Sequence, residues 1–322
     1  MNRLKKNIKQ LLLVSVILSL LIFLLLCPVQ GLQAARTGLG LWLNTLIPTL
    51  LPFLILTDLL LKTTVIEKLL SPFSWIWKHL FGLSPMGAYG FFTGILCGYP
   101  MGAKTAVRLY EEGKISRREA HYLLAFSNNA SPAFIRSYLA VGCLHNKTSA
   151  VEIIKVFLLA DLFCMLFFRF VIYHNHTVSV FSAVKSTNDF NQKKTSTVRS
   201  LGASIDVSIM NSFETITRLG GYILLFSLIT AMTVQIRTSY PFIQNVLCAA
   251  LEITSGLHIL EQSEIPYQIQ YLCSMAITAS GGMCILLQTK SILKDTLSVR
   301  PYLGGKCINT LATVLIILLS KF

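Results

Sequence analysis

The feature that most constrains this chain is a series of apolar segments of membrane-spanning length. Segment Leu11–Cys27 carries no charged residue and approaches the roughly 17–25 residues that a transmembrane helix needs. Only 13% of the 322 residues are charged, whereas soluble domains average about 25%. So large an apolar surface is expected to face lipid rather than to be buried in a single core. The sequence predicts an all-α polytopic membrane protein with about 8–10 membrane helices, some of them broken or re-entrant.

Charge and cysteine patterns exclude several other classes of protein. The net charge of +14 comes from Lys and Arg residues between apolar segments, as in cytoplasmic loops. No nucleic-acid motif accompanies them, so nucleic acid is not an expected partner. The eight Cys residues show no Cys-x-x-Cys spacing, and neither a disulfide framework nor a metal site is predicted. Without His-Glu-x-x-His or Gly-x-Ser-x-Gly, we expect no enzyme, no catalytic residue and no cofactor.

The spacing of polar stretches divides the chain into four parts. Residues 1–38 are predicted to form an N-terminal transmembrane helix and a connector, with the basic N-terminus in the cytoplasm. Residues 39–174 would form a first repeat and residues 207–322 a second. The polar stretch 175–206 between them is predicted to be a cytoplasmic linker.

Two interruptions recur at nearly the same offset in the two halves. Gly102 and Gly256 are 154 positions apart, and Ser127 and Ser280 are 153 positions apart. With the N-terminus and the linker both cytoplasmic, the first spans of the two halves run in opposite directions, which predicts an inverted repeat. Corresponding breaks in two halves indicate a transporter's midplane site. The alternative, two unrelated polar interruptions, stays open at this point.

The stretch between the first two breaks combines helix stops and starts. Pro100 lies between glycines and would end one half-helix and begin another. Ser131 followed by Pro132 is typical of a helix N-cap. In the charged segment between the breaks, Ser116 and Glu119 have the spacing of a capping box. Non-helical backbone at membrane depth occurs only where it is buried in protein or lines a water-filled cavity.

These breaks predict a solute-binding site. Asparagine amides offer donors and an acceptor in one plane, the N-terminus of a half-helix favours negative charge, and a tyrosine ring can stack on a planar solute. A carboxylate at the second break suits a coupling ion or a solute donor. The predicted site residues are Tyr99, Pro100, Gly102, Lys104, Ser127, Asn128, Asn129, Glu252, Ser280 and Gly281. Alternatively, the two asparagines only satisfy carbonyls freed by the break.

The same stretches resemble a known family. The residues that carry the resemblance are Gly98-Tyr99-Pro100-Met101-Gly102-Ala103-Lys104, Leu109-Tyr110-Glu111, Gly113-Lys114-Ile115-Ser116 and Leu124-Ala125-Phe126-Ser127-Asn128-Asn129 with Pro132. They are similar to the nucleoside-recognition, or Gate-domain, family, in particular to its sporulation integral membrane proteins. Glu252–Gly256 and Ser280–Gly282 look like the second-half motifs. The pattern extends from about Leu39 to Lys294, and the linker matches no family motif.

The resemblance implies a fold related to concentrative nucleoside transporters, with inverted repeats and re-entrant hairpins. It also implies a role in endospore formation, in the mother-cell membrane system, with a part in making the spore cortex. We therefore expect a multi-pass cell-membrane transporter or solute-binding protein. The alternative is a non-transporting scaffold for the cortex-assembly machinery. Expected partners are the lipid bilayer and a small-molecule solute, such as a nucleoside or a cortex precursor, and a homo-oligomer is left open.

Overall fold

The computed structural model describes residues 2–61, 63, 65–173, 201–235, 241–294 and 296–320. Every regular element in these ranges is a helix, which confirms the predicted all-α class. Most of the polar linker predicted at 175–206 lies outside the described residues. Its last positions, 201–206, are helical and open the first helix of the second half.

The described first half consists of ten α-helices with short π-helical and 3-10 segments between them. In chain order they are α1 (Asn2–Leu26), α2 (Pro28–Leu41), η1 (Trp42–Leu46), α3 (Ile47–Leu61), α4 (Val65–Leu70), η2 (Ser71–Phe73), α5 (Ser74–Ile76), η3 (Trp77–Phe81), α6 (Pro85–Cys97), α7 (Met101–Glu111), α8 (Arg117–Phe126), α9 (Pro132–Phe134), η4 (Ile135–Cys143), α10 (Ala150–Phe167) and η5 (Phe168–Ile172). The described second half has α11 (Leu201–Gln235), α12 (Pro241–Leu251), α13 (Ile253–Glu261), α14 (Tyr267–Ser280), α15 (Gly282–Leu293) and α16 (Arg300–Ser320).

Several of these helices are long and apolar enough to cross a membrane. Within the described residues, four stretches meet this criterion: Pro28–Leu60, Gly202–Gln235, Tyr267–Leu293 and Arg300–Ser320. The pair Lys68–Phe81 and Pro85–Cys97, bent by 81°, makes a fifth if it counts as one span. The protein is therefore a multi-pass membrane protein. The 8–10 membrane helices expected from the sequence included broken and re-entrant segments, which this count of long helices leaves out.

The first predicted boundary, between residues 38 and 39, falls inside a continuous helical stretch. The chain interrupts its helix at Cys27 and restarts with Pro28 at the first helical position, where a missing amide proton costs nothing. From there α2, η1 and α3 follow one another to Leu61. The connector and the first long span are thus one element.

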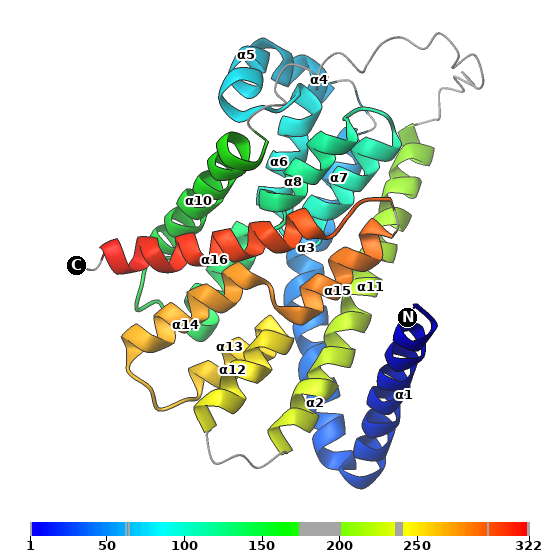
Figure 1. The fold of residues 1–322 in the computed structure, drawn as a ribbon, viewed down its shortest axis with the longest axis vertical. Coiled ribbons are helices and arrows are strands. Elements are labelled where there is room, and N and C mark those ends of the chain that lie inside the picture. Colours follow the sequence, from blue (N-terminus) through cyan, green and yellow to red (C-terminus); the bar gives the residue numbers. More distant parts are fainter. Residues whose placement is uncertain are drawn as a thin grey trace.

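Two helix pairs fold back on themselves and form hairpins. In α6–α7 the chain reverses at Gly98-Tyr99-Pro100, and a Cβ on Gly90 of α6 would lie 3.2 Å from Leu109 Cδ1 of α7. In α12–α13 it reverses at Glu252, and a Cβ on Gly256 would lie 2.1 Å from Ala249 Cα. The α6–α7 pair lies in the upper part of the molecule and the α12–α13 pair in the lower part (Figure 1).

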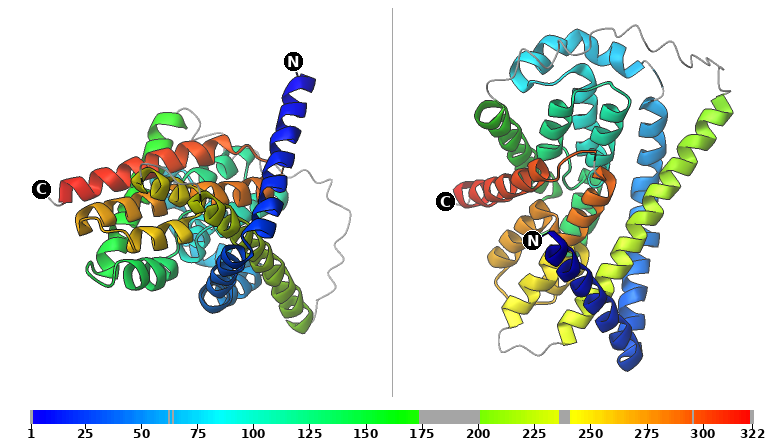
Figure 2. Two further views of the ribbon diagram at one scale, coloured as in Figure 1. Left: turned by 90° about the horizontal axis from the view of Figure 1, so that it is seen from below. Right: turned by 45° about the vertical axis from the view of Figure 1, so that its right-hand side comes forward.

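Each hairpin is followed by a broken helix and then by a single helix. In the first half α8 ends at Phe126 and helix resumes at Pro132; in the second, α14 ends at Ser280 and α15 begins at Gly282. Gly281 has φ +82°, which favours glycine. The order hairpin, broken helix, single helix therefore recurs, ending in α10 and α16. The long helices that precede it, α2–α3 and α11, lie side by side and run in opposite directions (Figures 1 and 2).

Two glycines allow the first hairpin to pack closely against the chain break that follows α8. A Cβ on Gly94 of α6 or on Gly102 of α7 would lie 1.9 Å from the carbonyl oxygen of Ser127. No side chain fits at that distance, so both arms of the hairpin approach this backbone only because these positions are glycine.

The predicted helix caps form, with one difference. Ser116 Oγ accepts a hydrogen bond from Glu119 N (3.2 Å), and Ser131 Oγ accepts one from Phe134 N (3.2 Å). The carboxylate of Glu119 does not return to Ser116 to close the capping box. Instead it accepts a 2.6 Å bond from Ser84 N, where α6 begins. The buried Glu119 side chain therefore helps to cap α6 rather than its own helix.

Candidate functional site

The tips of the two hairpins meet in the middle of the fold around a cavity of about 40 Å³, here called the inner cavity. Tyr99 comes from the first tip and Glu252 from the second. Each broken helix adds residues from just beyond its break. The polar or sulfur-bearing lining residues are Cys97, Tyr99, Ser131, Glu252, Thr254, Cys284 and Gln288. Residues far apart in the sequence, from both halves, thus share one cavity.

Two side chains of the inner cavity carry polar atoms without a partner. Tyr99 Oη and Gln288 Oε1 are both buried, and neither has a hydrogen-bond partner within the described part of the chain. The other end of the Gln288 amide donates to Cys284 Sγ at 3.1 Å. Buried polar groups are nearly always satisfied, and leaving one unsatisfied costs about 1–3 kcal/mol. A small hydrogen-bonding group that enters the cavity would therefore satisfy both atoms.

The carboxylate of Glu252 is, by contrast, fully engaged as the N-cap of α13. It accepts hydrogen bonds from Thr254 N (3.1 Å), Ser255 N (2.7 Å) and Thr254 Oγ1. The positive end of the helix dipole favours this negative charge. Glu252 thus has a structural role at the second break, and its binding of a coupling ion or solute stays a prediction.

A larger cavity of about 380 Å³, here called the vestibule, lies beside the inner cavity. Its wall combines residues of α3, α7, α11 and α15, and many are charged. These are Asp58, Lys104, Arg108, Glu111, Glu214, Arg218 and Lys294. Leu219 and Gln288 line both cavities, so the two are adjacent. The volume falls within the roughly 300–1,000 Å³ typical of small-molecule sites.

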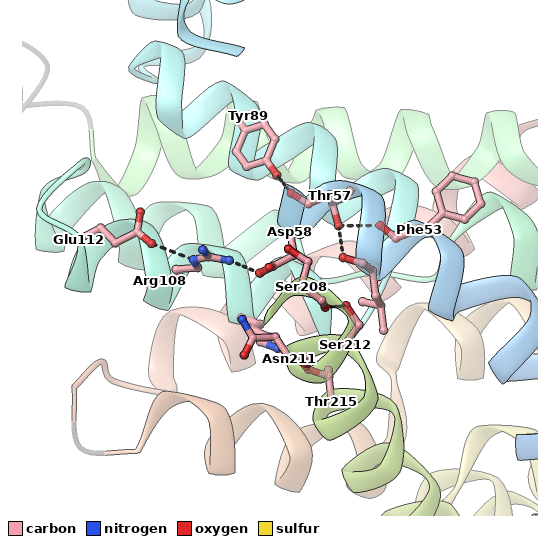
Figure 3. A network of polar contacts seen from close by, with 12 residues as sticks. Phe53, Thr57, Asp58, Tyr89, Arg108, Glu112, Ser208, Asn211, Ser212 and Thr215 are labelled. Carbon is pink, nitrogen blue, oxygen red and sulfur yellow. Dashed lines mark hydrogen bonds and ion pairs between the residues drawn. The ribbon is translucent and has the colours of Figure 1, made fainter. Parts of the chain in front are cut away.

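Ion pairs order the charged wall of the vestibule. Arg108 of α7 binds Asp58 of α3 and, through Nε, Glu112 at 2.8 Å (Figure 3). Lys114 also binds Glu112, at 3.0 Å. Partial burial opposes ionisation of Glu112, but the bonds from Arg108 and Lys114 outweigh it, so its pKa lies below the usual value. These contacts hold the end of α7 against α3.

Lys104 extends from α7 to α11. Its Nζ donates hydrogen bonds to the carbonyl oxygen of Asn211 (3.3 Å) and to Thr215 Oγ1. The predicted site residue Lys104 therefore lies on the vestibule wall, as does Pro100. Of the ten predicted residues, these two line the vestibule, while Tyr99 and Glu252 line the inner cavity.

The asparagine pair satisfies protein groups around the first break. Asn128 Oδ1 accepts a bond from Ala103 N (3.3 Å), and its Nδ2 donates to Thr289 Oγ1 (3.0 Å). Asn129 Nδ2 donates to the Phe126 carbonyl (2.8 Å) and to Asp161 (2.6 Å). These bonds fit the structural alternative. A direct contact of either asparagine with solute stays a prediction.

The four remaining predicted residues shape the breaks. Gly102 and Ser127 form the close backbone contact between the first hairpin and α8. Ser280 Oγ donates to the Ile277 carbonyl at 2.8 Å, and Gly281 takes the left-handed conformation between α14 and α15. In the described part, none of these four lines the inner cavity or the vestibule.

A buried ionic cluster lies beside Tyr99, and Asn129 is its one member among the predicted site residues. Lys306 of α16 donates to Asn129 Oδ1 (2.7 Å) and to the Ala279 carbonyl (3.1 Å). Its ammonium group lies 5.6 Å from the centre of the Tyr99 ring. Asn309 of α16 and Asn129 both donate to Asp161 Oδ1 at 2.6 Å. The sequence signal that could have revealed this cluster is Lys306 itself, a lysine inside an apolar segment, because such residues are functional or paired.

Comparison with known proteins yields one informative relative. The chain is 26% identical over 323 aligned residues to the sporulation integral membrane protein YlbJ of Bacillus subtilis (strain 168), covering 91% of this chain and 78% of that protein. No family model matches the chain, and no solved structure matches it. The predicted resemblance to a sporulation integral membrane protein is thereby confirmed. The chain is thus a multi-pass membrane protein that is similar to YlbJ over most of its length.

Proposed function

We propose that this protein binds a small polar solute between its two hairpin tips and transports it across the membrane. The observation that carries the proposal is the inner cavity with its two unpartnered polar atoms, Tyr99 Oη and Gln288 Oε1. One belongs to each half of the chain. A solute that offers both a donor and an acceptor satisfies them together.

The arrangement of helices supports transport more than a scaffold. Discontinuous helices with a site at the interface of two repeats are typical of secondary transporters, and this chain has one hairpin and one broken helix in each half. The vestibule supplies a polar space directly beside the inner cavity. A scaffold for the cortex-assembly machinery requires neither cavity.

The biological setting is proposed by similarity. The relative is named as a sporulation integral membrane protein, and we propose that this chain also acts during sporulation. The Gate-domain resemblance adds spore cortex formation and the mother-cell membrane system. The solute would then be a nucleoside or a cortex precursor, carried without an enzymatic step.

Thermal stabilisation of the detergent-purified protein tests the proposal. The panel contains nucleosides, nucleotides and cortex precursors, applied to the wild type and to Tyr99→Phe and Gln288→Leu. Tyr138→Phe and Gln270→Leu are matched controls, since these two side chains bond to the carbonyls of Thr254 and Leu260 and do not line the inner cavity.

We expect one class of compound to raise the unfolding temperature of the wild type and of both controls. The same compound should stabilise Tyr99→Phe and Gln288→Leu much less. A well-folded wild type that no compound stabilises contradicts the proposal and favours the scaffold.

A further inference from the structure

Lys104 is a half-buried cation of the vestibule wall that forms no ion pair within the described part of the chain. Its Nζ bonds to the neutral oxygens of Asn211 and Thr215. No carboxylate among the described residues forms an ion pair with it. Lys104 is half-buried and lines the cavity. A partly desolvated ammonium group without a counter-ion is costly unless an anion joins it.

Neighbouring charges do not provide that anion. Asp58 binds Arg108, and Glu214 binds Arg218 on the same helix. Both carboxylates therefore attract Lys104 only from beyond ion-pair distance. Glu111 and Lys294 also line the vestibule, and both are exposed to solvent.

The adjacent positions of the two cavities indicate which groups a ligand would present to each of them. Lys104 lies on α7, and the two residues that precede this helix are Pro100, which lines the vestibule, and Tyr99, which lines the inner cavity. Gln288 lines both cavities. A ligand in the vestibule that contacts Lys104 therefore lies beside the inner cavity, where Gln288 and Tyr99 have unpartnered atoms.

We propose that the solute carries an anionic group, which binds Lys104 in the vestibule, and a neutral hydroxyl- or amide-bearing part, which binds Gln288 and Tyr99 in the inner cavity. This inference rests on the proposed function and narrows its substrate to anionic compounds. Charge-assisted hydrogen bonds to an ammonium group are stronger than neutral ones, so the anionic group provides much of the affinity.

Matched pairs of ligands that differ only in the anionic group test this proposal. The probes are uridine with uridine 5′-monophosphate, and N-acetylglucosamine with its 1-phosphate. Binding to the purified full chain is measured by calorimetry at low and high salt. The variants are Lys104→Gln, which keeps a donor but removes the charge, and Lys155→Gln, which removes an exposed charge on α10 that lines neither cavity.

We expect a phosphorylated probe to bind more tightly than its neutral partner, and high salt to weaken that binding. Lys104→Gln should weaken it roughly 10- to 100-fold, the range for loss of a hydrogen bond to a charged group. Lys155→Gln should not change it. The salt dependence of the wild type gives a result even if Lys104→Gln fails to fold.

Two results overturn the proposal. Equal binding of both members of each pair, or unchanged phosphate binding in Lys104→Gln, shows that no anion binds at Lys104. If the neutral member then still loses affinity in Tyr99→Phe, the proposed function stands and this inference alone fails. If neither member of either pair binds the folded wild type, both fail.

Discussion

Lys306 donates a 2.7 Å hydrogen bond to Asn129 Oδ1 and so joins the last helix of the second half to the break in the first. Asn129 in turn donates to Asp161. The asparagine thereby lies between a buried cation and a buried carboxylate. The bond from Lys306 to the Ala279 carbonyl adds the end of α14. One ammonium group thus contacts residues at the breaks of both halves.

Replacing Lys306 by methionine is predicted to destabilise the protein strongly. The change leaves Asn129 Oδ1 without its donor and Asp161 without a nearby cation, and breaking a buried pair from one side costs about 3–5 kcal/mol. A double-mutant cycle with Asp161→Asn, followed by thermal unfolding in detergent, checks this. We expect the double mutant to be more stable than the sum of the single losses implies. Additive losses would show that the two charges do not interact.

Tyr99→Phe and Tyr138→Phe are predicted to differ in their effect on stability. Tyr99 Oη has no partner among the described residues, so its loss leaves stability unchanged or slightly higher. Tyr138 Oη donates to the Thr254 carbonyl at 2.7 Å, and its loss costs about 0.5–1.5 kcal/mol. Unfolding temperatures without solute measure both effects. A large loss of stability in Tyr99→Phe would mean that its hydroxyl has a structural role.

Gly102→Ala is predicted to prevent the first hairpin from packing against the chain break that follows α8. The added Cβ would lie 1.9 Å from the Ser127 carbonyl oxygen, a backbone atom that cannot move aside easily. Gly221→Ala in α11 is the matched control, because a Cβ there meets no atom within 4 Å. We expect the control to be as stable as the wild type or more so. Yield and unfolding temperature of the two variants distinguish them, and similar values would contradict the close contact.

Acidification is predicted to loosen the contact between α8 and the segment that precedes α16. His121 Nε2 accepts a bond of 3.0 Å from Ser298 N, which requires the neutral ring. Partial burial and the nearby Arg117 hold the His121 pKa below its ordinary 6.5. Because the folded pKa is the lower one, this contact stabilises the fold fully above pH 6.5 and is lost as pH falls through the folded pKa.

The check is the unfolding temperature between pH 7.5 and pH 5.0 for the wild type and His121→Gln. The wild type should lose more stability over this interval, since the variant has no imidazole to protonate at that position. Parallel curves would show that His121 contributes nothing to the pH dependence.

Much of the fold could be predicted from local signals in the sequence. Pro100 between glycines, the Ser131-Pro132 pair and Gly281 each impose a local backbone conformation, and each marks a helix end in the structure. The recurrence of these breaks predicted the recurring order of elements. The start of the first long span was misplaced because α2 is less apolar than α3 and its first residues read as a connector.

The site was harder to predict because its residues meet only after folding. Tyr99 and Glu252 were predicted from the breaks, and both line the inner cavity. Gln288 lies in the middle of α15, where an isolated glutamine has no local signature, and only packing leaves its Oε1 unpartnered. Asn128 and Asn129 had the right chemistry for a solute, yet their partners come from helices distant in the sequence. Local pattern cannot reveal those partners.

Uptake into liposomes tests the central claim most directly. The purified protein is reconstituted, and uptake of the compound that stabilises it best is compared for the wild type, Gln288→Leu and the control Gln270→Leu. The proposed function predicts saturable uptake by the wild type and the control, and uptake by Gln288→Leu close to that of empty liposomes. Wild-type uptake no faster than that of empty liposomes, despite binding, would contradict transport through this site.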